Sequence, residues 1–154
     1  MSLKRTFLLL LFMVAIILSA NSQEEINFTS LTIKDGLSSN TVVAILKDHY
    51  GFMWFGTEDG LDKFDGTNFK VYRYKPNDPS SLQSNEILSL YEDKTGNLWV
   101  ATSGGSLSLY DRKKDAFINF PAGEKKGLIA NNVILDVCSD FQDKIWVAHY
   151  SGVN

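Results

Sequence analysis

Residues 96–111 read GNLWVATSGGSLSLYD, and two other stretches of the chain repeat this pattern. Residues 51–65 read GFMWFGTEDGLDKFD, and residues 143–154 read DKIWVAHYSGVN, where the sequence stops. In each stretch a tryptophan lies in an apolar run, and a glycine follows it six residues later. Recurrence of such a pattern at a period of about 20–50 residues is the sequence signature of repeat proteins. The repeat is therefore the feature that decides the fold.

Several positions keep the same phase in all three copies. The tryptophans are 45 and 47 residues apart, and sets of aspartates, glycines and asparagines have the same two separations. The residues in phase are Trp54, Trp99 and Trp146; Asp48, Asp93 and Asp140; Gly60, Gly105 and Gly152; and Asn40, Asn85 and Asn132. A chance match at one position would mean little, but agreement at four positions indicates three copies of one structural unit.

Each unit contains four short runs with the composition of strands. In the first copy these are the apolar run VVAILKD at 42–48, the tryptophan run FMWFGT at 52–57, the alternating run LDKFD at 61–65 and the closing run NFKVYRY at 68–74. Turns of hairpin length, several with glycine, separate the runs. No helical period is evident after the N-terminal apolar segment. The sequence therefore predicts an all-β fold.

A unit of about 45 residues with four antiparallel strands has the size of one β-propeller blade. We expect residues 36–80 to form a first blade, residues 81–126 a second, and residues 127–154 a third that is cut short. Closed propellers have about four to eight blades. We therefore interpret the chain as an incomplete propeller of about three blades, the N-terminal piece of a longer protein.

The segment before the first blade has the pattern of a further strand. Residues 23–35 contain Phe28 and Leu31, whose spacing matches that of Phe69 and Tyr72 at the end of the first unit. We expect this segment to be an outermost strand donated to the last blade of the ring, a blade that the chain lacks.

The repeated residues have structural interpretations. We expect each tryptophan to fill the gap between blades, with its indole N–H bonded to an acceptor; a platform for stacking carbohydrate is the functional alternative. The repeated aspartates begin turns, where their side chains can accept bonds from backbone N–H groups. A calcium site is the sharper alternative, but no clustered D-x-D-G loop supports it. We expect the repeated glycines to adopt positive φ in turns.

The N-terminus has the features of a secretory signal peptide at residues 1–22. Lys4 and Arg5 precede an apolar run at 7–18, and small residues follow at Ala20 and Ser22. A membrane anchor is the alternative, but a spanning helix needs about 20 apolar residues. We therefore expect an exported, periplasmic protein.

The net charge and the residue types that could carry out chemistry argue against several classes of function. Without Lys4 and Arg5 the chain has 13 basic and 18 acidic residues, a net charge of −5, which argues against nucleic acid as a partner. Cys138 is the single cysteine, and its apolar context predicts a buried side chain. No Ser/His/Asp arrangement, metal-ligand spacing or phosphate loop is evident. We expect no catalytic residue, no metal, no cofactor and no enzyme activity in this segment.

The repeat resembles the two-component regulator propeller repeat. The stretches that carry the resemblance are SSNTVVAILKDHYGFMWFGTEDGLDKFD, QSNEILSLYEDKTGNLWVATSGGSLSLYD and ANNVILDVCSDFQDKIWVAHYSGVN. They share the pattern N-x-V-x-x-I-x-x-D, then G-x-L-W-V-G-T, then G-L-x-x-Y-D. Departures are mild: Asp143 replaces a turn glycine, His149 replaces a threonine, and the second copy has one extra residue in its G-L turn.

The resemblance implies a hybrid two-component sensor histidine kinase as the parent protein. In such sensors an exported propeller region recognises a ligand, commonly a breakdown product of polysaccharides, and signals through a membrane helix to a histidine kinase. It implies an oligosaccharide ligand, the remaining blades and the membrane and kinase modules as partners, and anchoring of the parent in the inner membrane. The alternatives are a propeller enzyme of lyase or glycosidase type and a protein-interaction scaffold.

Ligands of propellers usually meet one face, and two sets of loops are expected to share it. One set follows each tryptophan strand, and the other precedes each first strand, at residues 77–85 and 124–132. Polar and aromatic side chains break the repeat in the first set, and we predict that they bind the ligand: Glu58, Asp59, Ser103, His149 and Tyr150. Ordinary solvated turn residues are the alternative interpretation.

Overall fold

The computed structural model describes residues 7, 26–123, 125 and 128–154. The chain divides into two compact units, residues 1–30 and 31–154. The signal peptide expected at 1–22 lies outside the described residues except for Phe7. Nothing in the described part of the chain forms a helix of sufficient length and apolarity to cross a membrane.

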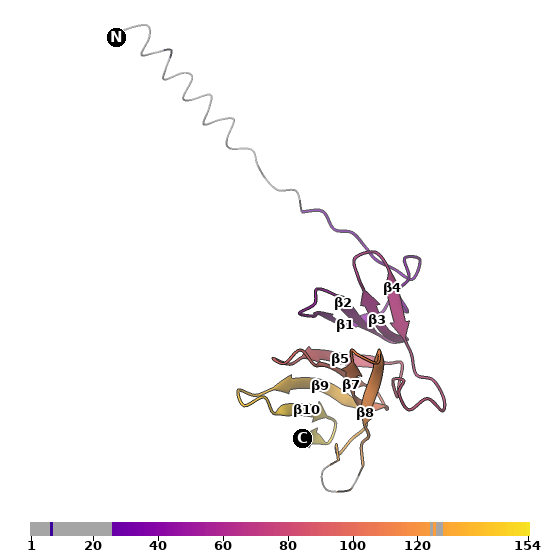
Figure 1. Cartoon of the computed structure of the whole chain (residues 1–154), viewed down its shortest axis with the longest axis vertical. Coiled ribbons are helices and arrows are strands. Elements are labelled where there is room, and N and C mark those ends of the chain that lie inside the picture. Colours follow the sequence, from indigo (N-terminus) through magenta and orange to yellow (C-terminus); the bar gives the residue numbers. More distant parts are fainter. Residues whose placement is uncertain (1–6, 8–25, 124, 126–127) are drawn as a thin grey trace. The chain divides into compact units, whose positions relative to one another are not determined.

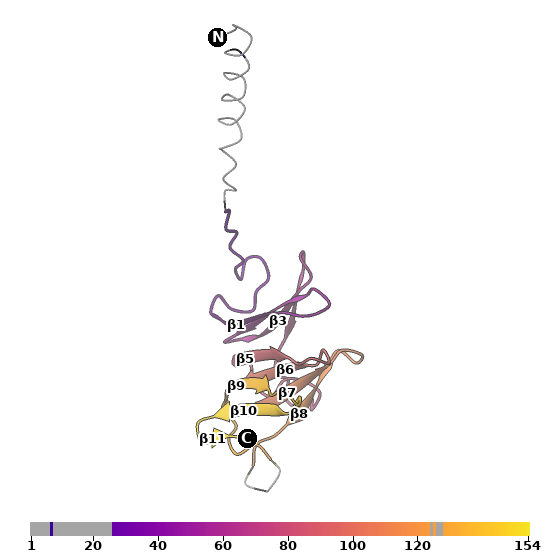
Figure 2. The same cartoon turned by 90° about the vertical axis from the view of Figure 1, so that its left-hand side faces the viewer.

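The described part of residues 31–154 consists of strands joined by turns and loops, without a helix, as the sequence predicts. Blade 1 contains β1 to β4, blade 2 contains β5 to β8, and blade 3 contains β9 to β11 (Figures 1 and 2). The bounds are β1 Val42–Lys47, β2 Met53–Thr57, β3 Gly60–Phe64, β4 Phe69–Tyr72, β5 Ile87–Glu92, β6 Leu98–Thr102, β7 Ser106–Asp111, β8 Ala116–Phe120, β9 Ile134–Ser139, β10 Ile145–His149 and β11 Gly152–Val153.

Each blade is an antiparallel sheet whose strands follow one another in chain order. The register repeats together with the sequence. Leu46 faces Trp54 across β1 and β2, Tyr91 faces Trp99 across β5 and β6, and Cys138 faces Trp146 across β9 and β10. An irregularity after the first residue pair recurs in β1 and β5, which shows that the units match even in their local distortions. The all-β propeller-blade fold is confirmed.

Residues 26–33 form no strand in this structure. An isolated strand has no neighbour to accept its backbone hydrogen bonds, and the blade to which we expected it to add is not part of this chain. Its role as an outermost strand stays a prediction.

The three sheets fan out from their first strands. β1 contacts β5, and β5 contacts β9, so that the first strands lie next to one another (Figures 1 and 2). The second strands contribute as well, because β2 contacts β5 and β6 contacts β9. The middle first strand, β5, has a blade on each side and is buried or half-buried along its whole length, which explains its continuous apolar run; β1 and β9 each keep exposed residues.

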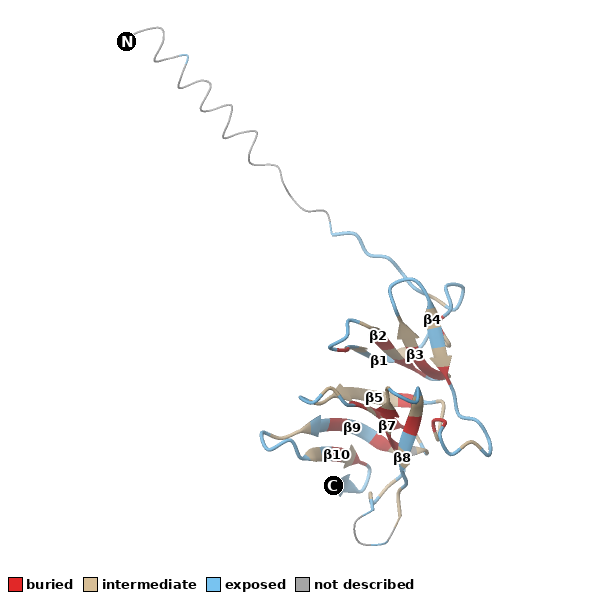
Figure 3. Cartoon of the chain, viewed as in Figure 1, coloured by how far each residue is buried: buried red, intermediate tan, exposed pale blue. Residues whose placement is uncertain are grey.

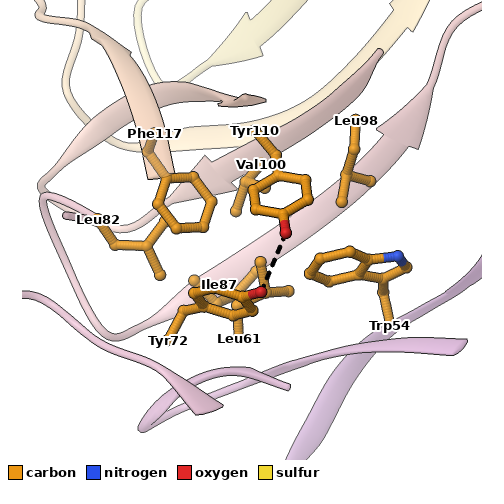
Figure 4. Packing of buried hydrophobic residues seen from close by; sticks show 9 residues of the cluster. All are labelled: Trp54, Leu61, Tyr72, Leu82, Ile87, Leu98, Val100, Tyr110 and Phe117. Atoms are coloured by element: carbon orange, nitrogen blue, oxygen red, sulfur yellow. Dashed lines mark hydrogen bonds between the residues drawn. The ribbon is translucent and has the colours of Figure 1, made fainter. Parts of the chain in front are cut away.

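One hydrophobic core lies between blades 1 and 2, and another lies between blades 2 and 3. Figure 4 shows the first core, in which Trp54 and Tyr72 of blade 1 meet Tyr110 and Phe117 of blade 2. Its remaining buried members are Leu61, Leu82, Ile87, Leu98 and Val100. The second core contains Ala101, Leu107, Ile134, Val137 and Val147, with Trp99 packed against it.

The prediction that Cys138 is buried is wrong for this structure. Its thiol is exposed, because it pairs across β9 and β10 with Trp146, which is itself 46% exposed. Figure 3 shows that β9 has exposed stretches between buried ones. The equivalent residues Leu46 and Tyr91 lie between blades and are half-buried. The apolar sequence context therefore identified an inter-blade position correctly but could not show whether a neighbour covers it.

Candidate functional site

Each blade contains a hydrogen bond between its repeated aspartate and its repeated tryptophan. The indole N–H of Trp54 donates to Oδ2 of Asp48 at 2.9 Å. Trp99 donates to Asp93 at 3.0 Å, and Trp146 donates to Asp140 at 3.1 Å. We expected each indole N–H to have an acceptor, and in all three blades this acceptor is the aspartate six residues before the tryptophan.

The second oxygen of each aspartate holds the turn between the first two strands. Oδ1 of Asp48 accepts the amide N–H groups of Tyr50 and Phe52 at 3.0 and 2.9 Å. The same pair of bonds recurs at Asp93, from Thr95 and Asn97, and at Asp140, from Gln142 and Lys144. Both oxygens of each aspartate are bonded, so these side chains anchor the turn and hold the indole of their own blade.

The tryptophans differ in exposure, and the difference follows their place in the array. Trp54 is fully buried, Trp99 is half-buried, and Trp146 is 46% exposed. A fully buried ring cannot stack on a sugar, so Trp54 acts in packing, with Tyr110 of the next blade 5.0 Å away in an edge-on arrangement.

The repeated glycines do not all have the same backbone conformation. Gly60 and Gly152 have φ of 140° and 129°, as predicted. In blade 2 the positive φ of 77° belongs to Gly104 instead, because this turn has one extra residue. Gly105 is required for another reason: a Cβ there would lie 2.6 Å from Oγ1 of Thr102 and 2.8 Å from the backbone of Gln83.

The turn after each tryptophan strand meets the loop that precedes the next blade. The side-chain amide of Asn85, just before β5, donates to Oδ1 of Asp59 in the β2–β3 turn at 3.3 Å. Arg73 bonds both the carboxylate of Asp59, at 3.0 Å, and its carbonyl, at 2.9 Å. In the next pair of blades, Asn132 donates to the carbonyl of Gly104 at 3.3 Å. The two loop sets expected to form one ligand face are therefore in contact.

The five predicted ligand residues differ in their availability on this face. Glu58 and Tyr150 are exposed, and Ser103 is half-buried. The side chain of Asp59 is 51% exposed even though Arg73 and Asn85 bind it. These four side chains can contact a ligand from solvent.

His149 is the exception, because it is only 6% exposed and both ring nitrogens are bonded. Nδ1 accepts the N–H of Ser151 at 3.1 Å, so Nε2 carries the proton and donates to Asn154 at 2.9 Å. Thr57, the equivalent residue of blade 1, likewise accepts the N–H of Asp59 two residues on. His149 thus retains the acceptor function of the threonine it replaces, and its direct contact with a ligand stays a prediction that this geometry does not favour.

A buried acidic side chain beneath the same face was not singled out in the sequence. Asp62 is fully buried and accepts bonds from the amide and the hydroxyl of Ser38, the latter at 2.7 Å. Ser38 in turn bonds Thr57 at 2.7 Å. Burial raises the pKa of Asp62, and the bonds from Ser38 offset only part of this shift. The alternation of LDKFD placed residue 62 on one face of its strand but could not identify its partner 24 residues away.

An ion network at the other end of the blades was also not predicted from the sequence. Arg112 of blade 2 bonds Asp48 of blade 1 at 2.7 Å and Glu92 at 2.9 Å. His49 bonds the same oxygen of Glu92 at 2.6 Å. Burial alone would raise the pKa of Asp48, but the bonds from Trp54 and Arg112 outweigh it and lower the pKa. Arg112 has no counterpart in blade 1, so the repeat gave no signal for it.

A second network joins the outer parts of blades 1 and 2. The phenols of Tyr72 and Tyr110 lie 3.0 Å apart, and both donate to Oδ1 of Asp115 at 2.6 Å (Figure 4 shows the two phenols). Lys70 pairs with the other oxygen of Asp115. Burial and the bond to Asp115 raise the pKa of Tyr110 to about 12. This network fastens the blades together, and nothing in it requires a ligand.

Among the residues that the structure describes, no three or more His, Cys, Asp or Glu side chains are grouped to hold a metal ion.

Comparisons with known proteins agree with this architecture. The family model described as two component regulator propeller matches residues 36–59 and 81–104. A curated histidine kinase, P4 of Formosa agariphila, is 51% identical over 55 residues, which are 36% of this chain and 4% of that protein.

Solved structures give the same result over a longer stretch. The extracellular domain of the putative hybrid two component system BT3049 from B. thetaiotaomicron matches 79% of this chain with a TM-score of 0.72 and 31% identity. That of BT4673 from the same organism matches 84% with a TM-score of 0.67 and 26% identity. The chain spans 17% and 18% of these two structures. Two segments of the chain thus match the two component regulator propeller family, and its blades are similar to those of these extracellular domains.

Proposed function

We propose that this chain is part of the exported sensor region of a hybrid two-component histidine kinase and that it takes part in binding an oligosaccharide. The observation that carries the proposal is the similarity to extracellular domains of putative hybrid two component systems, at up to 31% identity over 79% of the chain. On this basis the protein is periplasmic, the parent is anchored in the inner membrane, and this segment binds without catalysing a reaction.

The loop face has the chemistry that a sugar requires. Hydroxyl groups of sugars bind to carboxylates and amides, and their apolar faces stack on aromatic rings. Glu58, Asp59 and Ser103 supply polar groups, and Tyr150 supplies a ring that is 76% exposed. Arg73 and Asn85 hold Asp59 in place, so its carboxylate needs little reorganisation to accept a further bond.

The test is calorimetric titration of the chain with a panel of glycan oligomers, in parallel with peptides. We expect one glycan class to bind, and expect both Asp59→Ala and Tyr150→Ala to weaken binding about tenfold, the order of a lost hydrogen bond or stacking contact. Lys113→Ala, an exposed change in the β7–β8 turn, is the control and should leave affinity unchanged.

The outcomes separate the parts of the proposal. Glycan binding that neither change weakens would show that the ligand face is assigned to the wrong residues. Binding of a peptide and of no glycan would favour the interaction scaffold and contradict the ligand class. Release of a shortened glycan during titration would favour the propeller enzyme.

A further inference from the structure

A groove lies between the outer strands of blades 1 and 2. Its volume is about 210 Å³, and it is lined by β4, by the start of β8 and by the connection between β4 and β5. Figure 1 shows this connection leaving the end of β4 and passing beside β8. The groove therefore lies between two complete blades, and none of its lining residues belongs to blade 3.

The connection is fastened to β8 by hydrogen bonds. The carbonyl of Ser80 accepts the backbone N–H of Phe117 at 2.8 Å. The side-chain amide of Asn119 donates to the carbonyls of Pro79 and Ser81, in both cases at 2.9 Å. These bonds hold one wall of the groove against the outer strand of blade 2.

The same connection holds Lys75 and Asp78 in fixed positions. Oγ of Ser81 accepts the backbone N–H of Lys75 at 3.0 Å and donates to the carbonyl of Asp78 at 2.8 Å. Oδ1 of Asp78 accepts the backbone N–H and the hydroxyl of Ser80 at 3.0 and 2.6 Å. A ligand that binds here therefore pays little entropy for ordering the wall that it meets.

Three charged side chains that line the groove have bonding capacity that no other described residue uses. Arg73 binds Asp59 through Nε and Nη2, which leaves Nη1. Lys75 makes no side-chain hydrogen bond with any described residue, and Asp78 uses only its Oδ1. The groove thus offers two donors and one acceptor to a molecule from solvent.

The charges around the groove balance one another. Each cation that lines it has an acidic neighbour: Lys70 has Asp115, Arg73 has Asp59, and Lys75 has Asp78. Because no charge is left over, an anionic ligand gains little in this groove. A sugar hydroxyl both donates and accepts, so it can use both kinds of group.

The size of the groove limits the ligand to one ring. A cavity of about 150 Å³ holds a benzene molecule, so the groove has room for a single sugar ring. Tyr72 and Phe117, which are buried in the first core, also line it and supply an apolar part for the ring carbons.

We propose that this groove is a second subsite, which takes one neutral sugar residue of the glycan that contacts Asp59 on the loop face. This subsite rests on the proposed function of the chain. Arg73 is the link, because its guanidinium binds Asp59 on the loop face and Arg73 also lines the groove. A glycan of two or more residues extends from Asp59 past Arg73 to Lys75 and Asp78.

Calorimetric titration of the full chain tests the subsite, with neutral oligomers of glucose, galactose, mannose and xylose from single sugars to tetramers and with matched uronate oligomers. Lys75→Ala and Asp78→Asn should each weaken binding of the longer neutral oligomers about tenfold, the order of a lost hydrogen bond. Both should leave single sugars unaffected, whereas Asp59→Ala should weaken every length. Asp78→Asn keeps an oxygen for the bonds from Ser80. Lys47→Ala, at an exposed lysine of β1, is the matched control and should change nothing.

Lysine acetylation followed by mass spectrometry of peptides locates the contact independently of affinity. In the presence of a saturating amount of the tightest-binding oligomer, Lys75 should lose most of its reactivity, because the sugar covers its amine. Lys47 should react at the same rate with and without the oligomer.

The outcomes separate this subsite from the proposed function. If Asp59→Ala weakens binding, neither groove variant does and Lys75 stays reactive, the loop face stands and the groove is overturned. Weakening of single sugars by Lys75→Ala would overturn the continuity with Asp59. Tighter binding of uronate than of neutral oligomers, lost in Lys75→Ala, would overturn the neutral class of ligand. If no glycan of any length binds, the proposed function fails and the subsite fails with it.

Discussion

Asp48 lies six residues before Trp54, and its carboxylate accepts the buried indole N–H of that tryptophan at 2.9 Å. The same carboxylate accepts two turn amides and pairs with Arg112 of the next blade at 2.7 Å. A single side chain thus fixes the turn of its own blade, the rotation of the tryptophan and the contact with the neighbouring blade.

The equivalent aspartates should contribute unequally to stability. Asp48→Ala leaves a buried indole N–H without an acceptor and removes one of the two carboxylates that bind Arg112, which should cost about 3 kcal/mol. Asp140→Ala should cost much less, because Trp146 is exposed and water can replace the carboxylate. Urea unfolding of the two variants checks the order. Equal losses would show that the aspartates act only on their own turns.

Substitutions of the tryptophans should lower the free energy of unfolding in the same order along the blades. Trp54→Ala removes a fully buried ring from the first core and should cost about 3–5 kcal/mol. Trp146→Ala removes a ring that is half in solvent and should cost clearly less. Trp54→Phe, which keeps an aromatic ring, is the control and should fall between them. The same unfolding measurement applies, and a Trp146→Ala loss as large as that of Trp54→Ala would contradict the account.

The acid sensitivity of the fold should depend on Asp115. Its burial alone would raise the pKa, but bonds from Lys70, Tyr110 and Tyr72 together lower the pKa to about 2. A depressed pKa contributes stability that is present above the unfolded pKa of about 4 and is lost as the pH falls toward 2. Asp115→Asn should flatten the decline in unfolding free energy over this range. An unchanged slope would show that the carboxylate is not bonded as described.

Asp62 should have the opposite effect on how the free energy of unfolding depends on pH. Because burial raises its pKa, the folded state holds this proton more tightly than the unfolded state does. The associated stability is present below about pH 4 and is lost as the pH rises through the raised pKa. The unfolding free energy of Asp62→Asn, relative to the unchanged chain, should therefore increase with pH across this window. A relative stability that falls or stays flat would show that Asp62 is not shielded from water.

The two adjacent glycines of blade 2 offer a local test. Gly104→Ala meets no neighbour within 4 Å, and its cost is the strain of positive φ, about 1–2 kcal/mol. Gly105→Ala would collide with Thr102 and the backbone of Gln83, so the loop before β5 must move. We expect the Gly105 variant to be less stable and, in contrast to the Gly104 variant, to show faster hydrogen exchange at residues 83–86. Similar exchange in both would contradict the close approach.

The sequence repeat predicted the structural features that recur in every blade, and it did not predict contacts made by residues that occur only once. The phase of the tryptophans and aspartates located the strands and turns, and both halves of the Asp48–Trp54 bond were recognised as groups that needed partners. Their mutual bond was not recognised, although the constant separation of six residues was a signal for it. Arg112 and Asp115 occur once, so no pattern pointed to their contacts with blade 1.

The candidate ligand residues show the same division. The sequence indicated which turns break the repeat, and the Asp59–Asn85 bond supports the shared face. It could not show that His149 is buried, because nothing in the residue pattern indicated that Asn154 and Ser151 bond its two ring nitrogens. Burial of a turn residue is decided by tertiary contacts that residue type alone does not specify.

Asp48 and Arg112 bond across the contact between blades 1 and 2, and a double-mutant cycle on this pair measures the strength of that contact. Asp48→Ala, Arg112→Ala and the double variant are unfolded in urea, with Asp93→Ala and Arg112→Ala as a control pair that has no mutual bond. We expect a coupling energy of about 1–3 kcal/mol for the first pair, as for residues in one charged network, and near additivity for the control. Additivity of Asp48 and Arg112 within about 0.3 kcal/mol would contradict the packing of blade 1 on blade 2.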